Sequence, residues 1–287
     1  MRKIRVRKHA VVLNRSAGGD TVISIVLCIM AVIMFLPMWY LIVNAFKPIG
    51  ELSITPPKFY AIKPTFQNFI DLFTNVNITW VPISRYIFNT IFISLSATFG
   101  SLLIGSLTAY ALSKVRMPGY KGILKLITYS MMIGSVISGL VDFFVFAWLG
   151  MFNTYAVSII PQWVGTVGLY LMKNFIDANV SDEMIEAARI DGASEWTIFM
   201  KIALPMIKPA WLTTLALTFQ TAWNTGSSGY VWSEQLKTFN VAISTISGSS
   251  AGASSAASVL MMSVPIIVFV VNQSKIVETM GSSGMKS

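Results

Sequence analysis

The sequence predicts an all-α membrane protein with six transmembrane helices. Of its 287 residues, 54% are hydrophobic and only 11% are charged, whereas a soluble domain carries roughly 25% charged residues. The apolar residues gather in six runs, and a helix of roughly 20 apolar residues crosses a hydrocarbon core about 30 Å thick. Because lipid offers the backbone no hydrogen-bond partners, each run must be helical.

The N-terminal part is expected to hold a basic tail, one membrane span and an external segment. Residues 1–20 contain six Lys or Arg and form a cytoplasmic tail. Residues 21–43 are longer than the ~7–15 residue apolar core of a signal peptide and lack a small-residue cleavage site, so they are predicted to remain as the first span. Residues 44–85 contain five prolines, which indicates an irregular external segment with one short helix near residues 66–73.

Residues 86–272 are predicted to form the core domain, followed by a cytoplasmic tail at 273–287. The core holds the other five spans, expected at 86–112, 122–149, 154–172, 210–223 and 251–271. The first of these five is rich in Gly, Ala and Ser, which suits a close approach of neighbouring helices. The segment between the last two spans, 224–250, is rich in Gly and Ser and is expected outside the membrane.

The Lys and Arg residues are distributed unevenly between the two sides of the membrane. With the N-terminus in the cytoplasm, 16 of the 21 Lys and Arg lie in the tails and inner loops. Cytoplasmic loops carry such an excess, so both termini and the loop at 174–209 are predicted to be cytoplasmic. The net charge of +9 therefore predicts no nucleic-acid partner, because the basic residues lie between apolar spans rather than on one polar domain.

The loop between the fourth and fifth spans is patterned as a helical hairpin. Ser181 is a good N-cap for a first helix, and Gly192 can adopt the left-handed conformation that ends it. Ser194 can cap a second, amphipathic helix, in which Trp196, Phe199 and Ile202 are expected to anchor the helix to the membrane-side scaffold. This second helix is predicted to end near Pro205.

The same loop carries a spaced motif, E-A-A-x3-G-x9-I-x-L-P, which runs from Glu186 to Pro205 without a gap or substitution. The motif resembles the cytoplasmic loop in the membrane subunits of bacterial binding-protein-dependent ABC importers. The stretch Glu-Ala-Ala-Arg-Ile-Asp-Gly-Ala-Ser at 186–194 resembles most closely the carbohydrate branch, in particular the smaller maltose-type permease subunit. The resemblance extends from Tyr86 to the end of the chain. It implies the transmembrane domain of a type I ABC importer in the bacterial cytoplasmic membrane, with a coupling helix in this loop.

The resemblance also implies partners: a second permease subunit, identical or homologous, two ATPase subunits, and an extracytoplasmic solute-binding protein. The residues expected to couple to the ATPase are Glu186, Ala187, Ala188, Asp191, Gly192, Ala193, Ile202, Leu204 and Pro205. Small side chains near the turn would let it enter a cleft on the ATPase. Glu186 could pair with a basic residue of that partner, or could cap a neighbouring backbone group.

The chain itself has no catalytic, nucleotide-binding, cofactor or metal motif. The segment 281–287 only superficially resembles a phosphate-binding loop, because Met285 interrupts the required Gly-Lys pair. The single cysteine, Cys28, lies in an apolar run, and the single histidine, His9, lies in the basic tail. We therefore expect a protein that is not an enzyme, with ATP hydrolysed on a partner subunit.

Three side chains are candidates for the solute pathway: Asp142, Trp163 and Trp223. Asp142 is the one carboxylate inside an expected span, and an intramembrane ionisable group indicates function by default. The other interpretation of Asp142 is a hydrogen bond to a neighbouring helix. Trp163 and Trp223 could stack on sugar rings, or could anchor span ends at the membrane interface.

Two other classes of function compete with the importer permease. A secondary transporter driven by an ion gradient would need paired intramembrane ion sites in internal repeats, but the sequence shows one such Asp and no visible repeat. A membrane scaffold or sensor has no specific support. The leading interpretation is a permease subunit of an importer for a carbohydrate, expected to be an oligosaccharide, and the sequence leaves the identity of the sugar open.

Overall fold

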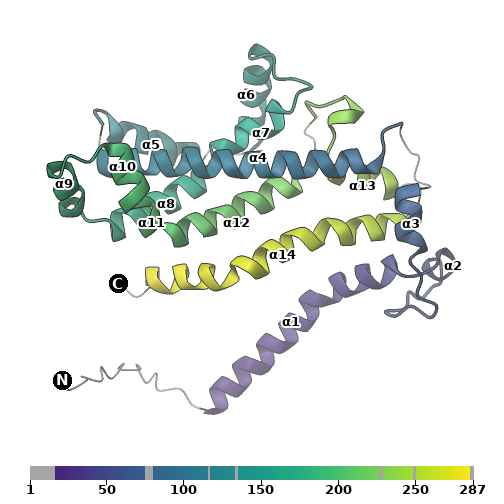
Figure 1. Cartoon of the computed structure of the whole chain (residues 1–287). Helices are drawn as coiled ribbons and strands as arrows, with labels where there is room; N and C mark the ends of the chain where they lie inside the picture. Colours follow the sequence, from purple (N-terminus) through teal and green to yellow (C-terminus); the bar gives the residue numbers. More distant parts are fainter. Residues whose placement is uncertain are drawn as a thin grey trace.

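Every regular element is a helix within the residues that the computed structural model describes, which are 17–74, 80–115, 117–132, 135–225, 229–247 and 250–284. Within these ranges, three helices are long and apolar enough to cross a membrane: α1 (Ala17–Ala45), α4 (Ile83–Tyr110, continued by the π-helix η1, Ala111–Val115) and α14 (Ala251–Gly284). The helix α12 (Lys208–Asn224) qualifies only together with the segment before it, from which it bends by 79°. Helices α4, α12 and α14 run alongside one another through the middle of the molecule, and α1 diverges from them (Figure 1).

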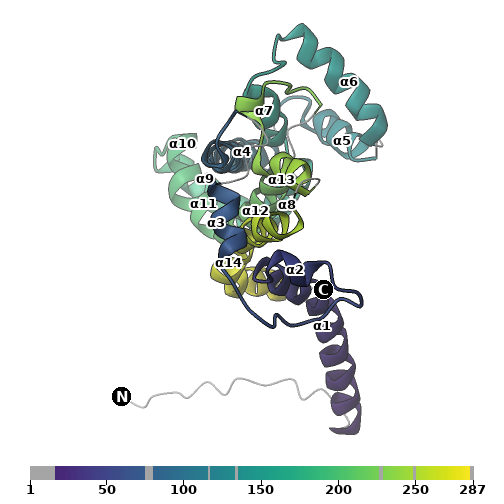
Figure 2. The same cartoon turned by 90° about the vertical axis from the view of Figure 1, so that its right-hand side faces the viewer.

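The expected span at 122–149 is not a single helix. It is divided into α5 (Tyr120–Ser130) and α6 (Ser135–Trp148), which project to one side of the central helices (Figure 2). Helix α5 has 11 residues and α6 has 14, so neither half has the roughly 20 residues of a full crossing. Gly134, which interrupts the run in the sequence, lies outside the described residues.

The expected span at 154–172 is likewise divided, into α7 (Ala156–Trp163) and α8 (Thr166–Asn179). Pro161 removes one backbone donor from α7, and Gly165 then takes an extended conformation with φ −65° and ψ 98°. The expectation of one continuous helix is therefore wrong for this run too. Irregular backbone is tolerated at membrane depth where it is buried in protein or lines a cavity.

Within the described residues, the two segments expected outside the membrane, 44–85 and 224–250, contain four short helices. Helices α2 (Ile49–Leu52) and α3 (Gln67–Thr74) follow α1, and α3 confirms the short helix predicted near residues 66–73. Between α12 and α14 lie the 3-10 helix η3 (Glu234–Leu236) and α13 (Phe239–Ser247).

Two buried clusters hold the long helices together. The larger one lies where α3 and α13 meet the central helices and includes Leu72, Tyr86, Trp223, Ile246 and Ala256. The second one joins the far end of α4 to the motif loop and includes Tyr110, Met172, Ile176, Ile185 and Ile198. Small residues matter for this packing, because a Cβ atom at Gly100 would lie 2.0 Å from Nε1 of Trp163. The predicted close approach of a helix to this span is confirmed at that position.

Candidate functional site

The loop with the spaced motif folds as two helical arms joined by a tight turn at one end of the central helices (Figure 1). The first arm is α9 (Asp182–Ile190). The second arm consists of α10 (Glu195–Ile198), the π-helix η2 (Phe199–Ala203) and α11 (Leu204–Met206). We refer to residues 182–206 as the α9–α11 hairpin.

Both predicted N-caps are confirmed. The Ser181 Oγ accepts a hydrogen bond from the backbone N–H of Met184 at 3.3 Å, and the Ser194 Oγ accepts one from Thr197 at 3.3 Å. Each cap satisfies one of the N–H groups that the first turn of a helix leaves without a partner. The local sequence therefore fixes where each arm begins.

The turn between the arms has the geometry of a Schellman motif. Gly192 has a φ of +80°, its N–H donates to the carbonyl of Arg189 at 3.0 Å, and the N–H of Ala193 donates to the carbonyl of Ala188 at 3.0 Å. This bond pattern requires a left-handed residue at the position of Gly192. No heavy atom lies within 4 Å of where its Cβ would be, so the backbone conformation rather than crowding requires glycine there.

An ion pair spans the turn and connects it to the end of α4. The Nε of Arg189 lies 2.7 Å from Oε1 of Glu195, and the Tyr110 hydroxyl donates to Oε2 of the same carboxylate at 2.7 Å. The hydrogen bond from Arg189 lowers the pKa of Glu195, against an opposing effect of burial, and the same bond raises the pKa of Arg189. Since Glu195 uses both oxygens, it holds the two arms and α4 in one arrangement.

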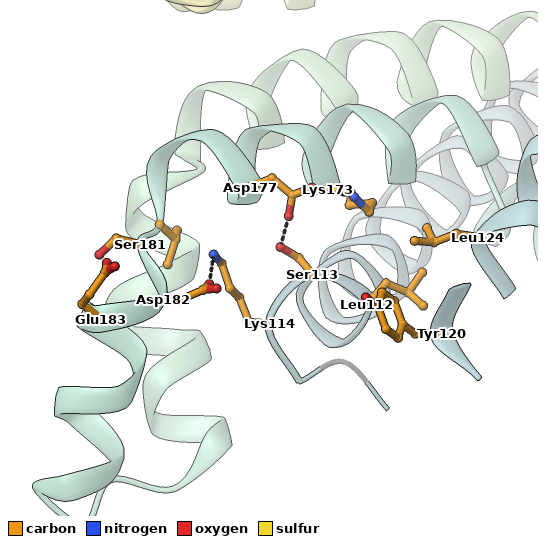
Figure 3. A pocket seen from close by; sticks show the side chains of 11 residues that line it. Leu112, Ser113, Lys114, Tyr120, Leu124, Lys173, Asp177, Ser181, Asp182 and Glu183 are labelled. Carbon is orange, nitrogen blue, oxygen red and sulfur yellow. Dashed lines mark hydrogen bonds and ion pairs between the residues drawn. The ribbon is translucent and has the colours of Figure 1, made fainter. Parts of the chain in front are cut away.

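A polar hollow of about 500 Å³ lies at the base of α9, where η1, α5 and α8 meet it (Figure 3). Lys114 Nζ lies 2.6 Å from Oδ1 of Asp182, although the side chain of Lys114 is only 5% exposed. The Ser113 hydroxyl donates to Asp177, whose other oxygen lies 2.5 Å from Nζ of Lys173. Opposite charges compensate one another within the hollow. Its contacts therefore join the end of α4 to the first arm of the hairpin.

The two faces of the α9–α11 hairpin differ in burial. The inner face buries Ile185, Ile198, Phe199 and Ala203 against the end of α4 and α8. The outer face exposes most of the predicted coupling residues of the turn, namely Glu186, Ala187, Asp191 and Gly192, while Ala188 and Ala193 are half-buried. The structure thus gathers the Glu-Ala-Ala and Gly parts of the motif on one exposed surface.

The distal part of the motif lies elsewhere. Ile202 and Leu204 are half-buried and pack against the inner cluster, and Pro205 is exposed. The helix continues past Pro205 to Met206 rather than ending at it, and the chain bends at the fully buried Ile207 to enter α12. The predicted end of the helix near Pro205 is therefore confirmed to within one residue.

Ile190 and Trp196 are the most exposed large apolar side chains of the hairpin, at 86% and 58%. The ring of Trp196 nevertheless lies 5.9 Å from that of the buried Phe199, so its predicted role as an anchor stays a prediction. Ile190 was not among the predicted site residues. The signal for it was present, because Ile190 falls five residues after the buried Ile185, out of phase with the inner face of a 3.6-residue helix. Ile190 lies within the motif, between the exposed residues Ala187 and Asp191.

The three pathway candidates lie apart from the hairpin and make different contacts. Trp163 is half-buried, and its Nε1 donates to the carbonyl of Ser96 at 3.1 Å. Trp223 is buried in the core, where its Nε1 donates to the carbonyl of Met261 at 2.8 Å. Asp142 lies on an exposed part of α6. Within the described ranges, no group of three His, Cys, Asp or Glu side chains is arranged to hold a metal ion.

Residues 19–278 match the family model described as the binding-protein-dependent transport system inner membrane component. The chain belongs to this family. It is accordingly a multi-pass protein of the cytoplasmic membrane and a permease component of an ABC transporter.

This inner membrane component is similar to permeases whose names state sugar substrates. The galactooligosaccharides transport system permease protein GanQ of Bacillus subtilis is 32% identical over 274 residues, which cover 91% of this chain and 94% of GanQ. The polygalacturonan/rhamnogalacturonan transport system permease protein YtcP of the same species is 30% identical over 208 residues, covering 72% of this chain and 69% of YtcP.

The fold of this family member is also found in a solved structure. A chain of a bacterial ABC transporter involved in the import of the acidic polysaccharide alginate superposes with a TM-score of 0.73 at 21% identity, covering 91% of this chain and 98% of that one. The predicted fold, the all-helical transmembrane domain of a type I ABC importer, is confirmed by this likeness.

Proposed function

We propose that this chain is a permease subunit of an ATP-driven importer, coupled to a separate ATPase subunit through residues 186–205. The observation that carries the proposal is the α9–α11 hairpin. Its turn exposes Glu186, Ala187 and Gly192, while its opposite face is fixed to α4 through Glu195. A surface that is exposed on one side and rigidly attached on the other is suited to transmit motion from a partner.

The transported solute is proposed to be a carbohydrate, of oligosaccharide size, delivered by an extracytoplasmic binding protein. The support comes from relatives named for galactooligosaccharides and for melibiose, raffinose and stachyose. The structural likeness to an alginate importer is consistent with the same class of solute. We retain Asp142, Trp163 and Trp223 as pathway candidates, although the contacts of Trp223 favour a packing role.

Six crossings, with both termini in the cytoplasm, are proposed for the assembled protein. Helices α1, α4, α12 and α14 would each make one crossing, and the pairs α5–α6 and α7–α8 would each make a broken one. The excess of Lys and Arg in the inner loops supports this orientation. It places the α9–α11 hairpin on the side where ATP is available.

A second permease subunit, identical or homologous, is proposed to complete the pathway together with two ATPase subunits. Along α1 the apolar side chains between residues 22 and 36 are exposed in the isolated chain. In the assembly these side chains must meet lipid or another subunit, since they cannot face water at such length.

Reconstitution into liposomes tests the proposed function. The chain would be assembled with its second permease and ATPase subunits, and uptake of labelled oligosaccharides would be measured with the binding protein outside and ATP inside. We expect uptake that requires ATP and persists in the presence of ionophores. Uptake by the chain alone, or uptake that collapses when ion gradients are dissipated, would instead support a secondary transporter.

A further inference from the structure

Helix α4 makes polar contacts at both of its ends with segments that are distant in the sequence. Its first turns hold the segment before α13, and its last turns hold the α9–α11 hairpin. In Figure 1 these two segments lie near opposite ends of α4.

At the first end, one stretch of α4 fixes the segment that contains η3. Asn89 is fully buried, and its Nδ2 donates to the carbonyls of Gln235 and Lys237, at 2.8 Å each. One residue further, the Thr90 Oγ1 accepts a hydrogen bond from the N–H of Phe239 at 2.8 Å. Three buried or half-buried backbone groups of residues 235–239 thus find their partners on α4, and an unpaired buried backbone group is costly.

A side-chain contact adds to this attachment. The Tyr86 hydroxyl donates to Oε1 of Glu234 at 2.7 Å, and the other oxygen of Glu234 lies 2.5 Å from Nζ of Lys237. The Oδ1 of Asn89 in turn accepts a hydrogen bond from Tyr155 at 2.8 Å. The segment 234–239 therefore follows the position of α4 at this end.

At the other end, α4 and η1 hold both arms of the hairpin. Tyr110 donates to Glu195 at the start of the second arm, and Lys114 pairs with Asp182 at the start of the first arm. Asn89 and Tyr110 are 21 residues apart on one continuous helix, which corresponds to about 30 Å at 1.5 Å per residue. A continuous helix that packs along one face against α7, α8 and α12 transmits a displacement with little bending.

We propose that α4 mechanically links the α9–α11 hairpin to the segment 234–239 on the opposite side of the membrane. When the hairpin moves with the ATPase, α4 moves segment 234–239, which is the side from which solute is delivered. This inference rests on the proposed function and extends it. Tyr86, Thr90, Tyr110 and Lys114 act as positioning residues in this linkage, and none is assigned a contact with solute or nucleotide.

Pairs of spin labels test the linkage in the complete transporter in nanodiscs, with Cys28 replaced by serine. One pair, at Lys201 and Lys121, reports on the hairpin, and the other, at Gln235 and Phe73, reports on the opposite side; all four side chains are exposed. Distances would be measured without nucleotide and with ATP plus vanadate. In the otherwise native chain we expect both distributions to shift.

Two double variants then each remove the polar contacts at one end of α4. In Y110F/K114M we expect the hairpin pair to respond as before, while the shift of the outer pair falls at least threefold. In Y86F/T90V we also expect an unchanged response of the hairpin pair and a shift of the outer pair that falls at least threefold. The matched control is Thr98→Val, because the Thr98 hydroxyl is also buried on α4 but donates to Ser94 of its own helix at 2.7 Å; it should leave both shifts unchanged.

The outcomes distinguish the linkage through α4 from the proposed coupling of the hairpin to the ATPase. An outer shift of native size in both double variants, with the hairpin still responding, would overturn the linkage and leave the proposed coupling intact. Failure of the hairpin pair to respond in the native chain would overturn the coupling itself. Loss of the outer response in T98V as well would also count against the linkage, since it would show general sensitivity of α4.

Discussion

The indole Nε1 of Trp223 donates to the backbone carbonyl of Met261 at 2.8 Å, and this carbonyl belongs to the residue four positions before Pro265. Because proline has no N–H, it leaves the carbonyl four residues earlier without its helical donor. Both Trp223 and Met261 are buried, so no water replaces the missing partner. Trp223 therefore donates to the carbonyl that Pro265 leaves without a helical donor.

Replacing Trp223 by phenylalanine leaves the buried carbonyl of Met261 without a donor, which should destabilise the protein by about 1–3 kcal/mol. The loss of packing from the smaller ring adds to this. Pro265→Ala restores the backbone N–H that can donate to the carbonyl of Met261. In a P265A background, Trp223→Phe should therefore destabilise the protein less. The measurement is thermal unfolding of the four proteins of this double-mutant cycle in detergent. Equal costs in the two backgrounds would show that the indole hydrogen bond has no special role.

Local features of the fold could be predicted from the sequence, and long-range ones could not. Ser181, Ser194 and Gly192 act within a few residues of themselves, so their types and spacing were sufficient to predict two caps and a turn. Trp223, in contrast, finds its partner 38 residues away. Nothing in the local sequence distinguishes a tryptophan at a membrane interface from one that satisfies a distant carbonyl.

The broken helices show a second feature that the sequence alone could not predict. Membrane helices tolerate Gly and Pro when neighbouring elements satisfy the freed backbone groups, so Pro161 and Gly165 did not by themselves predict the break between α7 and α8. The candidate site was predicted better than its surroundings because its motif lies within one hairpin. Its attachment through Tyr110 was not foreseeable, since 85 residues separate Tyr110 from Glu195.

Gly192→Val should abolish solute-stimulated ATP hydrolysis, with a loss of at least tenfold, while leaving membrane insertion intact. The left-handed conformation costs a residue with a Cβ roughly 1–2 kcal/mol, and a β-branched residue is the least tolerant of it. Gly192→Asn should keep more activity, since asparagine tolerates this conformation. The measurement is ATPase activity of the reconstituted complex.

The control for this substitution is Gly150→Val. Gly150 also has a positive φ, +63°, and no heavy atom lies within 4 Å of where a Cβ would be. It lies between α6 and α7, away from the hairpin. Similar backbone strain there should leave stimulated hydrolysis near the native level. If G150V lost as much activity as G192V, or if G192V transported normally, the turn at Gly192 would not be the coupling contact.

Ile190→Glu should weaken binding of the ATPase subunit by about thirtyfold, which corresponds to about 2 kcal/mol, the loss typical of an interface anchor. Ile190 is 86% exposed in the isolated chain, so the substitution should barely change stability. Ile49→Glu is the matched control, since Ile49 is 65% exposed and lies in α2, remote from the hairpin. Affinity would be measured by titrating ATPase onto the detergent-solubilised permease, and equal affinities for the two variants would exclude Ile190 from the interface.

The ion pair between Arg189 and Glu195 should make the α9–α11 hairpin sensitive to acid. The pKa of Glu195 lies below its usual value when the chain is folded, so its contribution is fully present above the ordinary glutamate pKa of about 4.3 and is lost as the pH falls through the lowered value. Because both side chains are partly exposed, the effect is local and weakened by solvent. Hydrogen exchange of the Gly192 and Ala193 amides, corrected for the intrinsic pH dependence of exchange, should show constant protection from pH 7 to about 5 and a decline below about pH 4. In Glu195→Gln, protection at neutral pH should be lower and this decline should disappear, whereas an unchanged acid response in E195Q would assign the sensitivity to another carboxylate.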